Sequence, residues 1–78
     1  MRVKQPSCIV SFHTTADAMA TEQLCRARGL AGRLIPAPRE LTADCGIAWC
    51  APEALGPALR AALDAAGIEP AGWSERLY

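Results

Sequence analysis

The chain has 78 residues, of which eight are Lys or Arg and eight are Asp or Glu, so its formal net charge is zero. This length predicts a single domain over residues 1–78, with residues 1–7 as a flexible N-terminal segment. The basic residues are spread along the sequence, which argues against nucleic-acid binding. No apolar run approaches membrane-spanning length and no signal-peptide pattern follows the basic start, so we expect a cytoplasmic protein with no membrane contact.

The first predicted elements are a strand and a helix. Residues 8–13 form a short run rich in β-branched and aromatic side chains, which favours a strand. Thr14, followed by Asp17 three residues later, is typical of a helix N-terminus, and Gly29 is expected to end that helix. Apolar residues recur at helical spacing along this segment. We expect them to face the core: Ala16, Ala20, Leu24 and Ala27.

Proline, glycine and apolar runs define the remaining elements. We predict a second strand over residues 30–36, a loop over 36–44 and a third strand over 46–51. A second helix over 57–66 and a last strand over 72–78 follow. Gly67 is expected to end the second helix in the left-handed conformation. This order in one small domain predicts an α+β, ferredoxin-like βαββαβ fold, with a four-stranded sheet and both helices on one face. Such a fold does not by itself imply an activity.

Cysteines occur at positions 8, 25, 45 and 50. An even number of cysteines suggests disulfides in a secreted protein, but nothing in this sequence indicates secretion, so we expect free thiols. There is no Cys-x-x-Cys spacing and only one histidine, so we expect no metal site and no cofactor.

The predicted topology brings several polar residues to one edge of the sheet. His13 ends the first strand, Thr14 begins the first helix, and the loop that carries Arg39 and Cys45 lies at the same edge. A helix N-terminus and a basic side chain would both favour the thiolate form of Cys45. Gly46 has no side chain, which leaves space next to the Cys45 sulfur for the close approach of a partner.

The third strand is expected to pair with the first, in a register that sets Cys8 opposite Cys50 as two core thiols. This register places Ile9, Ile47 and Trp49 on the sheet face away from the helices. A contiguous apolar patch on so small a domain usually marks an interface. We therefore expect partner docking or a homodimer through that face, with Trp49 as an anchor.

Three segments carry a resemblance to a known family: Ser-Phe-His-Thr-Thr, Gly-Arg-Leu-Ile-Pro-Ala-Pro-Arg-Glu and Asp-Cys-Gly-Ile-Ala. Together they resemble the small selenium/sulfur carrier protein-like family, and the likeness covers about residues 8–78. In that family the cysteine of the Cys-Gly pair is the carrier thiol, which implies Cys45 here. The resemblance implies a carrier protein more than a true enzyme.

Two hypotheses of different classes follow. In the first, the Cys45 thiol accepts sulfur or selenium as a persulfide or selenosulfide from a donor, such as a cysteine desulfurase or a selenocysteine lyase, and passes it to an acceptor protein. In the second, the chain is a non-catalytic interaction or regulatory module that binds a partner through its exposed apolar sheet face. Sulfur or selenium mass added to Cys45 alone would distinguish the first from the second.

Overall fold

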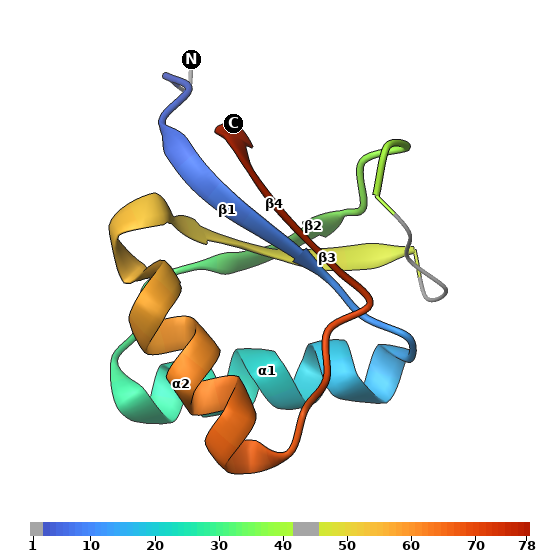
Figure 1. Cartoon of the computed structure of the whole chain (residues 1–78), viewed down its shortest axis with the longest axis vertical. Coiled ribbons are helices and arrows are strands. Elements are labelled where there is room, and N and C mark those ends of the chain that lie inside the picture. The colour runs from blue at the N-terminus through green and yellow to red at the C-terminus, as the bar shows by residue number, and fades with distance from the viewer. Residues whose placement is uncertain (1–2, 42–45) are drawn as a thin grey trace.

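The computed structural model describes residues 3–41 and 46–78. Within these residues the elements are β1 (Pro6–Ser11), α1 (Thr15–Arg28), β2 (Arg33–Pro36), β3 (Ile47–Pro52), the 3-10 turn η1 (Glu53–Leu55), α2 (Gly56–Ala66) and β4 (Gly72–Leu77). The strands form an antiparallel sheet in the order β2-β3-β1-β4, and α1 and α2 lie on the same face of it (Figure 1). The predicted α+β, ferredoxin-like fold is confirmed.

Local signals at the helix ends act as the sequence predicts. Thr14 caps α1, because its Oγ1 accepts a hydrogen bond from the Asp17 N–H at 3.1 Å. Gly29 ends α1 with φ of 69°, and Gly67 ends α2 with φ of 72°. Both glycines are in the left-handed region that residues with a Cβ rarely adopt. The start of α1 and the ends of both helices therefore follow from these capping residues, whereas α2 begins at Gly56 without a side-chain cap.

The side of α1 that faces the core differs from the predicted one. The buried residues are Ala18, Thr21 and Cys25, and the Thr21 hydroxyl donates to the Asp17 carbonyl oxygen at 2.9 Å. Of the predicted stripe only Leu24 packs against the core, while the alanines at positions 16, 20 and 27 are exposed. Alanines occur on several sides of this helix, so their spacing fits more than one face.

The N-terminal strand starts earlier than predicted. β1 begins at Pro6, and Gln5 exchanges two backbone hydrogen bonds with Tyr78, at 3.2 and 3.0 Å. Ser7 is buried. Backbone pairing with β4 therefore holds residues 5–7, which the sequence had suggested belong to a flexible segment.

The pairing of β1 with β3 is one residue away from the predicted register. Cys8 lies opposite Ala51, not Cys50. Because side chains alternate between the two faces of a strand, a shift of one residue exchanges the faces. Ile47 and Trp49 therefore pack on the side of the helices, and the prediction that they lie on the opposite face is wrong.

Apolar side chains are buried on both faces of the sheet. The larger cluster lies under the helices and includes Val10, Phe12, Trp49, Leu59 and Leu63. A second cluster lies on the face without helices, which we call the helix-free face, and consists of Ile9, Ile35, Ala48 and Cys50. Ile9 is therefore on the predicted face, but it is fully buried there.

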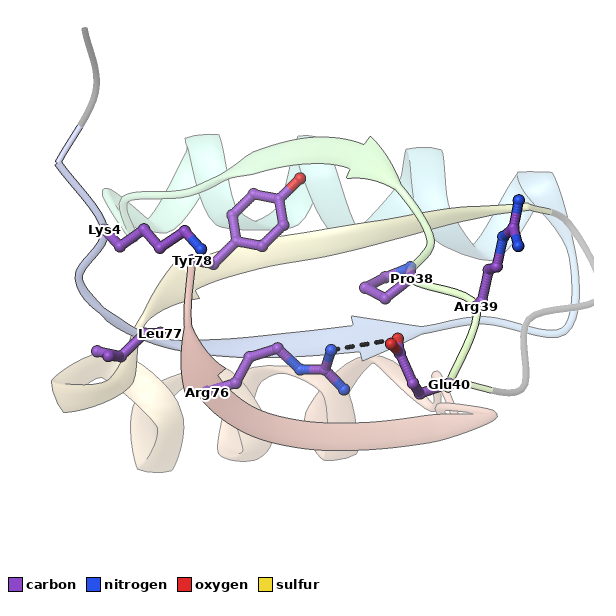
Figure 2. A pocket seen from close by; sticks show the side chains of 7 residues that line it. All are labelled: Lys4, Pro38, Arg39, Glu40, Arg76, Leu77 and Tyr78. Carbon is purple, nitrogen blue, oxygen red and sulfur yellow. Dashed lines mark hydrogen bonds and ion pairs between the residues drawn. The ribbon is translucent and has the colours of Figure 1, made fainter.

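Residues 37–41 cover the helix-free face. They leave β2 at one edge of the sheet and reach β4 at the other edge, where Glu40 forms an ion pair with Arg76 (Figure 2). Ala37, Leu41 and Tyr78 pack against the apolar cluster on the helix-free face. The apolar sheet face that the sequence suggested would be exposed is thus covered by the chain itself.

Candidate functional site

Cys45, the predicted carrier thiol, lies outside the described residues. Its neighbour Gly46 is described: its carbonyl oxygen accepts a hydrogen bond from the Ala37 N–H at 3.0 Å. This bond joins the two ends of the segment between β2 and β3. Gly46 has φ of 78°, and a Cβ added there would meet no described atom within 4 Å. Backbone conformation, and not crowding, is therefore the reason for a glycine at this position.

His13 and Thr14 lie at the end of the sheet where β3 begins. Ser11, the last residue of β1, is opposite Ala48, so Gly46 precedes β3 at this same end. The His13 side chain is exposed, and Thr14 is used in capping α1. The structure thus brings His13, Thr14 and Gly46 to one end of the sheet, and the effect of His13 and Thr14 on Cys45 stays a prediction.

Arg39, the other predicted activating residue, lines an open pocket of about 610 Å³ on the helix-free side of the sheet (Figure 2). Its lining includes Lys4, Pro38, Glu40, Arg76 and Tyr78. These residues come from the segment before β1, from the loop after β2, from β4 and from the residue that follows β4. The sequence did not reveal this pocket, because no local pattern links residues so far apart in the chain.

An ion pair and hydrogen bonds position the charged groups of this pocket. Arg76 Nη1 lies 3.3 Å from Glu40 Oε2, and Arg76 Nε and Nη2 each donate to Ser74 Oγ at 3.3 Å. The pKa of Glu40 is lowered, first by a hydrogen bond from its own backbone N–H and then by Arg76. Lys4 and Arg39 have no ion-pair partner among the residues that the structure describes.

Three of the four cysteines are buried. Cys8 and Cys25 are fully buried and Cys50 is 4 % exposed, and all three are free thiols. Burial raises the pKa of Cys8 and of Cys25, which lowers their thiolate fraction. Cys8 Sγ also donates a weak hydrogen bond to the Pro52 carbonyl oxygen at 3.9 Å. These three residues are core thiols, as expected for Cys8 and Cys50.

Trp49, the predicted interface anchor, is a core residue. It is 2 % exposed, and a Cβ added to Gly32 would come within 2.5 Å of its indole ring. Its Nε1 is buried without a hydrogen-bond partner among the described residues. Ile47 packs against the same helix-side cluster. Neither side chain is on the face through which docking was expected.

Within residues 3–41 and 46–78, no group of three or more His, Cys, Asp or Glu residues is placed to hold a metal ion. No helix in the same residues is long and apolar enough to cross a membrane.

The sheet order and the two helices on one face define an α+β domain of the ferredoxin-like class. Over residues 7–75, the sequence matches the family described as "Putative Se/S carrier protein-like", and the chain therefore belongs to this family. The matched range includes the segment with Cys45 and Gly46. No curated protein and no solved structure matches the chain at a significant level.

Proposed function

We propose that this protein carries sulfur or selenium on the thiol of Cys45. Membership of the Se/S carrier-like family supports the carrier role, and the match spans this cysteine. The observation that supports Cys45 as the carrier thiol is the burial of Cys8, Cys25 and Cys50. A thiol that exchanges a sulfur atom with other proteins must be reached by their reactive groups, and a thiol packed in the core is not reached.

The proposed reaction is sulfur transfer between thiols. The Cys45 thiolate attacks the terminal sulfur of a persulfide on the donor protein, forming a new S–S bond while the S–S bond of the donor breaks. The donor thiolate leaves with the electron pair and takes up a proton. Cys45 then holds a persulfide, and an acceptor thiolate removes the terminal sulfur by the same exchange. With a selenosulfide donor, selenium moves in the same way, and neither step needs an external oxidant.

The residues expected to favour the Cys45 thiolate differ in what they can contribute. The N-terminus of α1, next to His13 and Thr14, stabilises a nearby anion by about 0.3–1 kcal/mol at an exposed site. One pKa unit corresponds to about 1.4 kcal/mol, so the helix alone would change the thiol little. Arg39 carries a full charge and is expected to contribute more than the helix terminus. Arg39→Ala should therefore raise the pKa of Cys45 more than His13→Ala, measured by thiolate absorbance in a variant that retains only Cys45.

The proposal is tested by loading the protein and locating the added atom. The full chain is incubated with a cysteine desulfurase and cysteine, or with a selenocysteine lyase and selenocysteine, and its peptides are analysed by mass spectrometry without reductant. We expect the mass of one sulfur or selenium atom on the Cys45 peptide, and none in Cys45→Ser. Cys50→Ser is the matched control and should load normally. Loading that persists in Cys45→Ser would refute the assignment.

The alternative, docking through an exposed apolar sheet face, has less support. Residues 37–41 cover that face, and Ile9 at its centre has no exposed surface. Trp49 and Ile47 pack on the opposite side of the sheet. The large apolar side chains that are exposed among the described residues are Val3, Met19 and Leu77. Met19 lies on α1, Val3 precedes β1 and Leu77 is the last residue of β4.

A further inference from the structure

The pocket beside residues 37–41 has an excess of positive charge. Its lining side chains include three cations, Lys4, Arg39 and Arg76, and one carboxylate, Glu40. Over the whole chain the formal charge is zero, so this local excess is a property of the fold. A concave site with an excess of one sign of charge attracts ligands of the opposite sign.

Arg76 is held in place but keeps donors for a ligand. An arginine side chain has five N–H groups. Those of Arg76 make three hydrogen bonds, two to Ser74 Oγ and one to Glu40 Oε2. Two N–H groups are left over, on a guanidinium whose orientation is fixed. A guanidinium positioned in this way can bind a carboxylate or a phosphate group with little further loss of freedom.

The cations stand at different sides of the pocket. Figure 2 shows Lys4 directed toward Tyr78, whereas Arg39 and Glu40 lie on the loop side, where Glu40 meets Arg76. Lys4 precedes Gln5, whose backbone pairs with Tyr78, so its place beside that residue is set by the strand pairing. Between the two sides the lining includes Pro38 and the side chain of Tyr78. The volume of about 610 Å³ is within the range of small-molecule sites.

We propose that this pocket binds a small organic dianion. One anionic group is held by Lys4 beside Tyr78, and the other by Arg76 beside the loop. The guanidinium of Arg39 points away from Arg76 in Figure 2 and adds to the attraction through its charge. The uncharged middle of the ligand lies over Pro38 and Tyr78. A carboxylate and a phosphate both satisfy these cations. Binding at this pocket does not require the thiol chemistry proposed for Cys45, although Arg39 is named in both proposals.

The test uses three probes of similar length on the full chain. Glutarate carries two carboxylates, 3-phosphonopropionate carries a phosphonate and a carboxylate, and butyrate carries a single carboxylate. Binding is followed by amide shifts in ¹⁵N-edited NMR spectra. We expect saturable shifts around residues 39–40 and 76–78, with both dianions binding more tightly than butyrate. The tighter of the two dianions identifies the ligand as a dicarboxylate or as a phosphate compound. All affinities should fall with added salt.

Variants show which cations bind each of the two anionic groups of the ligand. Arg76→Gln and Arg39→Gln should each weaken glutarate about threefold to fivefold, the effect of an exposed charge pair. Lys4→Gln should weaken glutarate by about threefold while leaving butyrate unchanged, because a single carboxylate uses the arginine side. Arg28→Gln removes the same charge from the exposed end of α1 and should change neither the glutarate affinity nor the butyrate affinity.

Three results would overturn the proposal. The first is the absence of saturable shifts in the pocket with any dianion. The second is a loss of glutarate affinity in Arg28→Gln as large as in Arg39→Gln, which would indicate attraction to net charge alone. The third is an equal effect of Lys4→Gln on butyrate and glutarate. Lys4 and Arg39 are exposed, so their variants remain informative if Arg76→Gln disturbs the fold.

Discussion

Glu40 and Arg76 lie 36 positions apart in the sequence and form an ion pair, with Arg76 Nη1 3.3 Å from Glu40 Oε2. Arg76 belongs to β4 and Glu40 to the segment that follows β2, so the pair connects the two outer strands of the sheet across its helix-free face. The connection holds residues 37–41 over a buried apolar cluster and also forms one side of the charged pocket.

This ion pair predicts a pH dependence of stability. The folded-state pKa of Glu40 is below its ordinary value, so its contribution is present above the unfolded pKa and is lost as pH falls through the folded pKa. Glu40→Gln should therefore lower the free energy of unfolding slightly at neutral pH, and this difference should shrink as the pH falls through the folded-state pKa of Glu40. Urea unfolding at several pH values measures this difference. Glu69→Gln, at an exposed site, is the control, and a Glu40→Gln effect that is independent of pH would contradict the prediction.

The four thiols should differ widely in reactivity. Cys8 and Cys25 are fully buried with raised pKa values, and Cys50 is covered on the helix-free face, so all three should react slowly in the native protein. Cys45 should be alkylated first. Brief iodoacetamide treatment followed by peptide mapping measures the order, and the same treatment in urea should label all four equally. Native labelling of Cys8 as fast as Cys45 would contradict the core assignment.

The cap of α1 offers a direct test of a sequence signal. Thr14→Ala removes the oxygen that accepts the Asp17 N–H and should cost about 1 kcal/mol of stability. Thr15→Ala changes the exposed neighbouring threonine, in the first position of the helix, and should have a much smaller effect. Chemical denaturation of both variants compares them. Equal losses would show that the Thr14 hydroxyl is not the source of the effect.

The sequence predicts element order and helix ends well because these depend on local chemistry. Thr14 with Asp17, Gly29 and Gly67 act within a few residues of their own positions. Together with the apolar runs they are sufficient to predict the ferredoxin-like fold.

The strand register is not predictable in the same way. The two alternating sets of β3, Ile47 with Trp49 and Ala48 with Cys50, are both apolar, and both are buried to some degree. The alternation of apolar and polar residues distinguishes the two faces of a strand only where one face is polar. In β3, a register error of one residue therefore exchanges the two faces without placing a polar side chain in the core. The pocket was missed for a related reason: the Glu40–Arg76 contact is long-range and has no local signature.

The contact between Trp49 and Gly32 gives a direct test of where the tryptophan packs. A Cβ at position 32 would lie 2.5 Å from the indole ring, too close without a shift of the tryptophan. Gly32→Ala should therefore destabilise the protein by about 1–3 kcal/mol, as overpacking does in other cores. Gly56→Ala is the matched control: its new Cβ would be 3.8 Å from Trp73, an ordinary contact, so we expect little loss.

A second substitution shows whether the tryptophan is the cause. Trp49→Phe removes the larger ring, and because Nε1 has no hydrogen-bond partner among the described residues, no such bond is lost with it. Alone it should destabilise by leaving a cavity. Combined with Gly32→Ala, part of that space accommodates the new methyl group, so the double variant should be more stable than the sum of the single effects, by about 1 kcal/mol. Strictly additive effects in urea unfolding would mean that Trp49 does not pack on Gly32, and would contradict its place in the helix-side cluster.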